Sequence, residues 1–312
     1  MLALLAPGQG AQTPGFLTPW LEDATSRELV TQWSKLINLD LIALGTTADA
    51  DEIRETSHAQ PLLVTAGLIS FAQAFGGQNI SFDFYAGHSV GEITAASIAG
   101  AFDGDSALTL VNVRGRAMSA SATGSKTGMS AVLGGEREVV VEALLALGLT
   151  PANENGGGQI VAAGALEALA KLAENPPAGA RVRPLQVSGA FHTNVMQPAV
   201  TALADAAREI SVTNPAAPVI SNRDGAIITG GDELVARIVG QVSGPVRWDL
   251  CMQTLADQGV TGVIEVAPGG TLTGLVKRAQ PGIELFALKT PEDISAAREF
   301  ALTHSGKSKG GN

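Results

Sequence analysis

The sequence predicts an α/β protein of two lobes, in which a smaller lobe is inserted into a larger one. An apolar run at the start of the chain ends in a Gly-rich loop, which is typical of a buried parallel strand. A second predicted strand leads directly into a Gly-x-Ser-x-Gly turn and a helix. In the middle of the chain, the predicted elements follow the order β-α-β-β-α-β, which is the ferredoxin-like pattern.

The first predicted strand is the continuous apolar segment at residues 1–6, and it belongs to a parallel central sheet. The loop that follows, Pro-Gly-Gln-Gly-Ala-Gln at 7–12, contains two glycines that let a backbone N–H approach a substrate closely. Open α/β sheets place their sites at the carboxyl ends of their strands. The loop is therefore either a simple turn or one wall of a site.

A helix is predicted over residues 62–75, with Pro61 at its first position, where proline is favoured. His58 and Gln60 then lie in the loop before this helix. Gln60 either faces a site or, as is usual for a glutamine in a loop, is solvated. We expect His58 to be structural or exposed.

The stretch around Ser89 has the context of a nucleophile elbow. Residues 80–86 predict a strand, residues 92–100 predict an Ala-rich helix, and Gly-His-Ser-Val-Gly at 87–91 joins them. The glycines leave room where strand and helix nearly collide, and the strained turn presents the Ser89 hydroxyl. Backbone N–H groups at the helix start lie beside it, ready to bind an oxyanion. The alternative is an ordinary turn in which Ser89 is the N-cap.

The helix predicted over residues 105–119 carries an arginine on its apolar side. At about 100° per residue, one arc collects Ala107, Leu108, Val111, Gly115 and Met118. Arg114 falls inside this arc, whereas Arg116 falls on the opposite, polar arc and is expected to be solvated. Because an unpaired buried charge is costly, Arg114 predicts either an anion-binding site or a structural salt bridge.

The predicted small lobe comprises residues 125–188, and the large lobe comprises residues 1–124 and 189–302. Strands of the small lobe are expected at 129–133, 150–153, 159–163 and 181–187, with helices at 136–147 and 166–174. In the second part of the large lobe, a helix is predicted at 198–209, the start of another within 241–248, and strands at 218–222, 260–266 and 283–288. Residues 303–312 predict a flexible tail.

Composition excludes several classes of protein. The formal net charge of −10 over 312 residues argues against a general nucleic-acid binder. The single cysteine, Cys251, excludes an internal disulfide and fits a reducing, cytoplasmic compartment. We expect no signal peptide, no membrane span and no zinc site. The apolar start lacks a basic flank, no apolar run has spanning length, and no Cys/His cluster is present.

Four histidines are candidate bases for Ser89. His88 should face the other side of the turn, His304 lies in the predicted tail, and His58 lies in the loop described above. His192 is preferred because it lies where the chain re-enters the large lobe and a cleft is expected. No Asp between the serine and this histidine sits convincingly at a strand end, so a backbone carbonyl is expected to orient the imidazole.

Five motifs, in this order, resemble those of malonyl-CoA:acyl-carrier-protein transacylases over nearly the whole chain. They are Pro-Gly-Gln-Gly-Ala-Gln at 7–12, Ala-Gly-His-Ser-Val-Gly-Glu at 86–92, Arg-Gly-Arg-Ala-Met at 114–118, Gly-Ala-Phe-His at 189–192 and Pro-Val-Arg-Trp at 245–248. The resemblance implies an α/β-hydrolase-like large lobe and a ferredoxin-like small lobe. It also implies transfer of malonyl from malonyl-CoA to the phosphopantetheine thiol of acyl carrier protein by a ping-pong mechanism, for fatty-acid or polyketide synthesis.

The resemblance further implies the roles of individual residues. Ser89 forms the malonyl ester, and His192 is the base, with its ring held by the backbone carbonyl of Gln241. Backbone N–H groups of Gln9 and Val90 form the oxyanion hole. The residues expected to bind substrate are Arg114, Met118, Asn153 and Phe191. The arginine binds the malonyl carboxylate, the asparagine holds a polar group or a water, and the phenylalanine resembles the malonyl-selective form.

Other functions stay open: an esterase or thioesterase, a non-catalytic acyl-binding relative, and an acyltransferase that supplies polyketide synthesis. The implied enzyme is a cytoplasmic monomer that uses no cofactor or metal and binds neither nucleic acid nor membrane. Because this chain is acidic, docking of an acidic carrier protein needs a basic patch. Lys277 with Arg278, or Arg181 with Arg183, are the candidates. One departure from the family pattern is His58, beside the Gln-Pro pair, where we expect a different residue.

Overall fold

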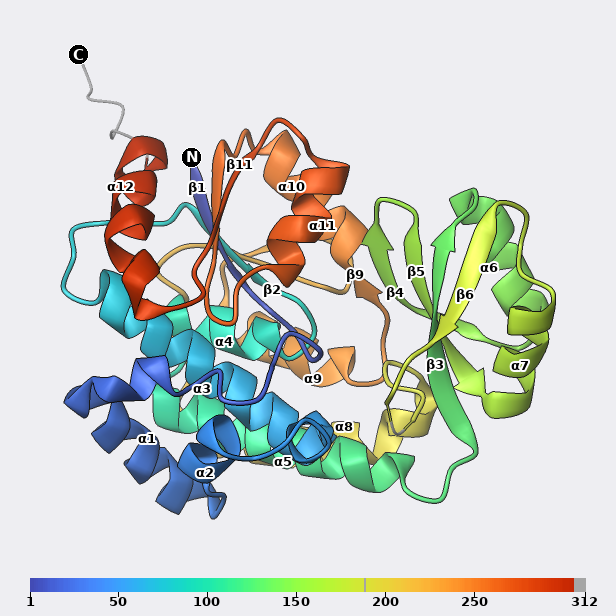
Figure 1. Cartoon of the computed structure of the whole chain (residues 1–312), viewed down its shortest axis with the longest axis horizontal. Helices are drawn as coiled ribbons and strands as arrows, with labels where there is room; N and C mark the ends of the chain where they lie inside the picture. Colours follow the sequence, from blue (N-terminus) through green and yellow to red (C-terminus); the bar gives the residue numbers. More distant parts are fainter. Residues whose placement is uncertain (188, 306–312) are drawn as a thin grey trace.

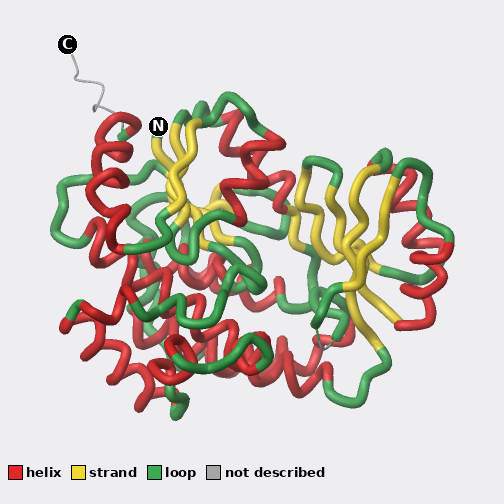
Figure 2. Tube along the Cα trace, in the orientation of Figure 1, coloured by secondary structure: helices red, strands yellow, loops and turns green. Residues whose placement is uncertain are grey.

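The computed structural model describes residues 1–187 and 189–305, which fold around two separate β-sheets. Figures 1 and 2 show the larger sheet among most of the helices, and the smaller sheet to the right with two helices on its outer side. The predicted α/β class is confirmed. No helix of the described residues is long and apolar enough to span a membrane.

The larger sheet is built around β1 (Leu2–Ala6), which lies near its middle. The other strands are β2 (Phe84–Gly87), β7 (Val219–Ile220), β8 (Ile227–Ile228), β10 (Gly262–Glu265) and β11 (Glu284–Ala287). Their order is β11-β10-β1-β2-β7-β8, and all neighbours are parallel except the antiparallel edge strand β8. Every residue of β1 is buried, as its unbroken apolar sequence predicts.

Helices cover both faces of this sheet. They are α1 (Ala24–Ile37), α2 (Leu41–Thr46), α3 (Thr56–Phe75), α4 (Gly91–Ile98), α5 (Gly104–Ala122), α8 (Gln197–Ala207), α9 (Gly231–Gln241), α10 (Trp248–Asp257), α11 (Thr271–Ala279) and α12 (Ile294–His304). Leu2 and Leu4 of β1 join a hydrophobic cluster with α1, α3 and α5, whereas Ala3 and Leu5 join another with α10 and α11. This division follows from the alternation of side chains along a strand.

The smaller sheet has the order β6-β3-β5-β4-β9. Its antiparallel strands are β3 (Thr127–Gly134), β4 (Thr150–Gly156), β5 (Gln159–Ala165) and β6 (Ala180–Pro184). Helices α6 (Arg137–Ala146) and α7 (Leu166–Glu174) pack over its own hydrophobic cluster. The elements β3 to β6 thus follow the predicted β-α-β-β-α-β order. The fifth strand, β9 (Val246–Arg247), pairs in parallel with β4, so a segment from beyond the small sheet's own elements extends it.

One predicted helix start is wrong. The helix expected at Pro61 begins at Thr56, so the proline lies inside α3. The first turn of α3, before the proline, is closed by hydrogen bonds from the backbone amides of His58 and Ala59 to the carbonyl of Glu55. The helix start predicted within 241–248 is confirmed at the last residue of that segment. The segment ends α9, passes through β9 and begins α10 at Trp248.

The predicted tail, 303–312, is wrong at its first two residues. Thr303 and His304 complete α12, and the histidine is buried, with its Nδ1 3.0 Å from Thr261 Oγ1. Residues 306–312 lie outside the described part of the chain. The position expected for the end of the small lobe, residue 188, also lies outside it.

Candidate active site

Ser89 lies in the turn between β2 and α4 and has a φ of 53°. A side chain in this left-handed region is strained, and such strain is common at functional positions. The flanking glycines are required by space. A Cβ on Gly87 would lie closer than 3.0 Å to the backbone of Gly91, and a Cβ on Gly91 would lie that close to the carbonyl of Ala6. The local sequence therefore dictates the turn that presents the serine.

His192 is the histidine that the fold brings to Ser89. Its Nε2 lies 2.8 Å from Ser89 Oγ, and its Nδ1 lies 2.8 Å from the backbone carbonyl oxygen of Gln241. A carbonyl only accepts, so Nδ1 carries the proton, and Nε2 is left to accept from the serine hydroxyl. No carboxylate is needed to orient the ring.

The charge state of His192 follows from its surroundings. Burial, reinforced by the positive charge of Arg114, lowers the pKa of His192 to about 3. The imidazole is therefore neutral at physiological pH, as a proton acceptor must be.

The other three histidines have different partners. His88 Nε2 lies 2.8 Å from Asn155 Oδ1, and His58 Nδ1 lies 2.9 Å from the carbonyl of Glu52. His304 Nδ1 lies 3.0 Å from Thr261 Oγ1. Only one of the four histidines therefore meets the serine hydroxyl.

Arg114 lies on the buried side of α5, with 1% of its surface exposed, and its side chain extends to Ser89. Its Nη2 donates to Gln241 Oε1 at 2.8 Å and to Ser89 Oγ at 3.2 Å, and its Nη1 donates to Gln60 Oε1 at 2.7 Å. These partners are all neutral. Among the described residues no carboxylate lies within ion-pair distance, which argues against the structural salt bridge.

The guanidinium of Arg114 keeps its charge and part of its donor capacity. Burial lowers its pKa to about 10, which leaves it protonated at neutral pH. Its Nε has no hydrogen-bond partner among the described residues. Arg116, two residues later, is exposed, as its arc predicts. A buried cation beside a serine hydroxyl is suited to bind an anionic group of a ligand.

Gln60 is a residue whose placement the sequence interpretation missed. It was expected in a loop, but α3 begins before it, and the side chain is buried with 2% exposed. Its Oε1 accepts from Arg114, and its Nε2 contacts Met118 Sδ at 3.5 Å. The Gln-Pro pair was the only local signal, and it carried no information about burial.

A cavity of about 290 Å³ opens above the serine and lies where the two sheets meet. Its lining includes every remaining candidate, namely Gln9, Val90, Met118, Asn153 and Phe191. It also includes Arg278 of the candidate docking pair and residues without a predicted role: Gln60, His88, Asn155 and, from α11, Thr271, Leu272 and Leu275. Among the described residues, no group of three or more His, Cys, Asp or Glu side chains is placed to hold a metal ion.

Two further residues at the turn were not predicted. Asn222, two residues after β7, accepts from the backbone amide of Ser89 at 2.7 Å and donates to the carbonyl of Gly87 at 2.7 Å. Glu92, in the first turn of α4, is 1% exposed and accepts from the amide of Asn222. The glutamate was visible as the end of the Gly-His-Ser-Val-Gly-Glu motif, but the asparagine is 133 residues from the serine and had no sequence signal.

Comparisons with known proteins identify the family of the chain. The acyl transferase domain family matches residues 5–289. Among curated relatives, this chain is 48% identical to the malonyl CoA-acyl carrier protein transacylase of Mycobacterium tuberculosis H37Rv over 299 residues, which cover 94% of this chain and 98% of that protein. It is 35% identical to the protein of the same name from Escherichia coli K12 over 307 residues, covering 96% and 99%.

Solved structures resemble the chain over a similar length. The crystal structure of MCAT from Mycobacterium tuberculosis has a TM-score of 0.91 and 47% identity, covering 95% of this chain and 99% of that one. A structure described as a type II PKS acyl-carrier protein in complex with its malonyl-transacylase has a TM-score of 0.88 and 29% identity, covering 96% and 99%.

Proposed function

The chain belongs to the acyl transferase domain family, and we propose that it is a malonyltransferase that moves the malonyl group of malonyl-CoA to acyl carrier protein. The observation that carries the choice of acyl group is the buried guanidinium of Arg114, 3.2 Å from Ser89 Oγ and without a carboxylate partner among the described residues. An acyl chain that ends in a carboxylate supplies an anion that this guanidinium can contact directly.

In the first half-reaction, Ser89 attacks the thioester carbonyl while its proton passes to Nε2 of His192. A C–O bond forms, and the carbonyl electron pair moves to the oxygen. When the tetrahedral intermediate collapses, the C–S bond breaks, and the proton on His192 goes to the departing CoA thiolate. The product is a malonyl ester of Ser89.

The oxyanion of this intermediate is assigned to the backbone N–H groups of Gln9 and Val90. Both residues line the cavity beside Ser89, and Val90 is the N-cap of α4, where helix N–H groups point outward. Among the described residues, neither N–H has a hydrogen-bond partner in the protein. Gln9 is held in place by its side chain, which donates to Arg54 O and Thr56 Oγ1 at 3.3 Å.

In the second half-reaction, the carrier thiol gives its proton to His192 and attacks the malonyl ester. The C–O bond to Ser89 breaks, and the serine oxygen takes the proton back from the imidazole. Every proton transfer and every new bond involves only side chains and the two substrates. The proposed reaction therefore needs no cofactor.

The proposal is tested by intact-mass analysis of the protein mixed with malonyl-CoA. We expect one malonyl adduct, which is absent in Ser89→Ala and disappears when acyl carrier protein is added. An adduct that persists in Ser89→Ala overturns the assignment of the nucleophile. Release of free malonate without a carrier protein points instead to a thioesterase.

Malonyl-CoA and acyl carrier protein are cytoplasmic, so we place the activity in the cytoplasm. We expect the chain to act as a monomer, because all residues assigned to the reaction come from one chain. Size-exclusion chromatography with light scattering measures the mass, and a mass of twice 31.8 kDa contradicts the monomer. Whether the carrier belongs to fatty-acid or polyketide synthesis is decided by comparing transfer to each.

A further inference from the structure

Glu92 is a buried carboxylate that has no role in the reaction proposed above. It lies in the first turn of α4, three residues after Ser89, and is 1% exposed. No cationic side chain of the described residues forms an ion pair with it. Burial raises the pKa of Glu92 to about 7, although hydrogen bonds and the charge of Arg114 oppose this rise. An ionised side chain in such a place is costly unless hydrogen bonds or an opposite charge compensate it.

Both oxygens of Glu92 accept hydrogen bonds from groups that can only donate there. Oε1 accepts from the backbone N–H of Asn222 at 2.8 Å, and Oε2 accepts from the side-chain Nε2 of Gln241. A carboxylate accepts at both oxygens, whereas a carboxylic acid or a primary amide must place a donor at one of them. The arrangement therefore needs the ionised side chain.

The two residues that Glu92 holds are in direct contact with the reacting groups. Asn222 Oδ1 accepts from the Ser89 amide at 2.7 Å. Gln241 makes two such contacts: its side-chain Oε1 accepts from Arg114 Nη2 at 2.8 Å, and its backbone carbonyl accepts from His192 Nδ1 at 2.8 Å. Its Nε2 also donates to the Ser89 carbonyl at 3.1 Å.

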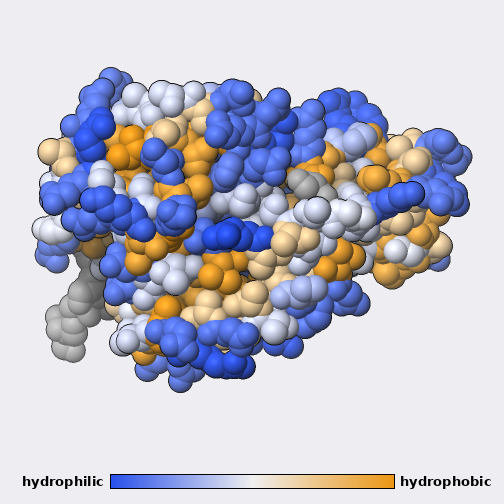
Figure 3. Space-filling model, turned by 90° about the horizontal axis from the view of Figure 1, so that it is seen from below, coloured by the Kyte–Doolittle hydropathy of each residue, from blue (hydrophilic) through white to orange (hydrophobic). Residues whose placement is uncertain are grey.

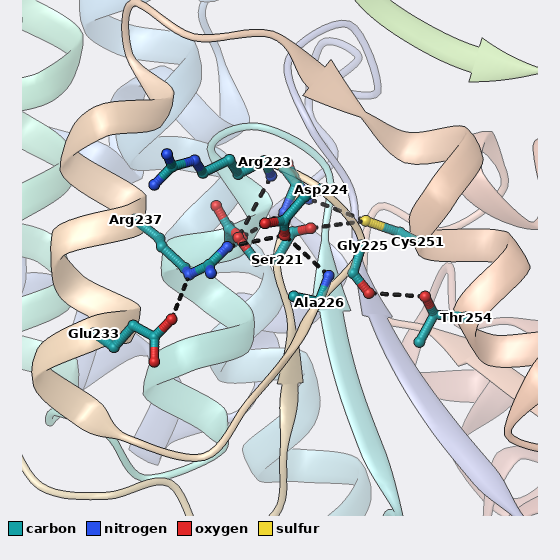
Figure 4. Close-up of polar contacts among 11 residues, drawn as sticks. Ser221, Arg223, Asp224, Gly225, Ala226, Glu233, Arg237, Cys251 and Thr254 are labelled. Atoms are coloured by element: carbon teal, nitrogen blue, oxygen red, sulfur yellow. Dashed lines mark hydrogen bonds and ion pairs between the residues drawn. The ribbon is translucent and has the colours of Figure 1, made fainter.

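The turn that carries Asn222 is anchored on its other side, so Glu92 meets a fixed partner. Figure 4 shows this turn, residues 221–226, between α9 and α10. Arg237 of α9 donates to Asp224 at 2.8 Å, and Thr254 of α10 donates to the carbonyl of Gly225 at 2.7 Å. Glu92 thus connects the start of α4 to two separate segments, the turn after β7 and the end of α9.

We propose that Glu92 is a positioning residue whose carboxylate, through the side-chain amide of Gln241, is the counter-ion of Arg114 and holds its guanidinium toward the malonyl carboxylate. The amide of Gln241 lies between the two charges, donating to Glu92 and accepting from Arg114. The backbone amide of Asn222 donates to Glu92, and its side chain accepts from the amide of Ser89. Asn222 thus fixes the Ser89 turn relative to Glu92 and Arg114. The inference rests on the proposed malonyl transfer, because it assigns Glu92 to the binding of that acyl group.

Ionisation of Glu92 should therefore govern malonyl transfer near neutral pH. The other ionisable groups that act on it are Arg114 from α5 and the Cys251 thiol from α10. The pKa of His192 is lowered to about 3, and that of Cys251 is raised, so neither titrates between pH 6 and pH 8 as Glu92 does with its pKa raised to about 7. Transfer should rise with pH across this range as the carboxylate forms.

The test compares Glu92→Gln with Glu265→Gln, measuring kcat/KM for malonyl-CoA and acetyl-CoA from pH 5.5 to 8.5. Glu265 is the matched control, since it is an equally buried carboxylate that accepts only from backbone and side-chain groups at the start of α11. In Glu92→Gln we expect malonyl transfer to fall by about 10²-fold, as misplaced reacting groups do. Acetyl transfer should fall at least tenfold less, and the rise near pH 7 should vanish.

Glu92→Asp keeps the charge on a side chain one methylene shorter, and we expect it to retain the pH-dependent rise and recover part of the rate. Glu265→Gln should lower the melting temperature without changing the malonyl-to-acetyl ratio or the pH profile. If Glu92→Gln forms the malonyl ester and behaves like Glu265→Gln in ratio and profile, the inference is overturned. If the wild type itself forms no malonyl ester, the proposed function fails instead, and the inference falls with it.

Discussion

The charge on Arg114 should decide which acyl group is transferred. Its guanidinium can give a malonyl carboxylate two parallel hydrogen bonds, and an acetyl group can accept neither. Arg114→Ala should therefore lower kcat/KM for malonyl-CoA by roughly 10²–10⁴-fold, the worth of two charge-assisted hydrogen bonds, and leave acetyl-CoA transfer equal or improved. Arg114→Lys should restore malonyl transfer only partly, because an ammonium group lacks the planar fork.

Arg116 provides the control for this selectivity, since it lies two residues away on the same helix and is exposed. Arg116→Ala should leave the ratio of the two kcat/KM values nearly unchanged. If Arg114→Ala lowered both substrates by the same factor, the residue would be structural, and the carboxylate would bind elsewhere.

Replacing His192 by Ala should slow malonyl transfer by roughly 10²–10⁴-fold, the usual contribution of a general base. The pKa of this histidine is lowered to about 3, so the ring stays neutral as the pH falls to 5 and its protonation does not limit the rate there. His58→Ala should have little effect on the rate, because that ring contacts the carbonyl of Glu52 and not the serine. The assignment of the base is wrong if the His58 variant is the slower of the two.

Among the elements, the β2–α4 turn depends on the absence of a side chain at Gly91. A Cβ there would overlap the carbonyl of Ala6 at the end of β1. Gly91→Ala should lower the free energy of unfolding by about 1–3 kcal/mol, as overpacking does, and abolish acylation of Ser89. The matched change is Gly240→Ala in α9, where a Cβ meets nothing within 4 Å.

Gly240→Ala should raise the free energy of unfolding by about 0.5–1 kcal/mol, because alanine favours the helix. Urea unfolding of both variants measures the two changes. Equal stability of the Gly91 and Gly240 variants would mean that the turn relaxes and that its glycines are not required.

Sequence patterns predicted well the first strand, the turn that carries Ser89 and the elements of the small lobe. The apolar run of β1, the elbow and the alternating elements of the small lobe are local signals, and the structure has them. Five helices were not predicted: α1, α2, α9, α11 and α12. These helices pack one face against the protein and leave the other in solvent. The amphipathic periodicity of α1, α9 and α11 is a local signal that the prediction did not use.

The candidate site divides in the same way. The serine, its glycines and the buried arginine lie within motifs that local geometry explains. Asn222 and the buried state of Gln60 depend instead on contacts between segments far apart in the chain, at separations of 133 and 54 residues. No periodicity or propensity encodes such a contact, so only the folded structure brings these side chains together.

At the scale of the whole molecule, the walls of the cavity come from the small sheet, from the loops after β1 and β2 of the larger sheet, and from α11. Asn153 and Val161 reach it from the small sheet, and Ser89 reaches it from the turn after β2. The pairing of β9 with β4 ties the two parts together beside it. Figure 3 shows one face of the molecule, on which hydrophobic groups are interspersed with hydrophilic ones over both lobes. On that face, no broad apolar surface marks a docking site for a carrier protein.

Charge offers a better guide to that docking site. The chain has a formal net charge of −10, so an acidic carrier protein should be repelled unless it meets a local cluster of cations. Of the two candidate pairs, Lys277 and Arg278 are exposed at the end of α11, and Arg278 also lines the cavity. Arg181 and Arg183 are exposed on β6 but are not part of the cavity wall. A carrier that delivers a thiol to Ser89 should therefore dock on the α11 pair.

Lys277→Glu tests this docking without altering the cavity wall, and Arg181→Glu introduces the same change of charge on β6. The α11 variant should raise KM for acyl carrier protein by about fivefold, since reversing an exposed charge changes an interaction by about 1 kcal/mol. Its KM for malonyl-CoA should stay nearly constant, and the effect on the carrier should shrink at high salt because exposed charges are screened. Steady-state transfer at two salt concentrations measures all three quantities. If Arg181→Glu raises the KM for the carrier more than Lys277→Glu does, the carrier docks on β6 instead. If Lys277→Glu raises the KM for the carrier and for malonyl-CoA equally, Lys277 acts on the shared cavity and not on the protein partner.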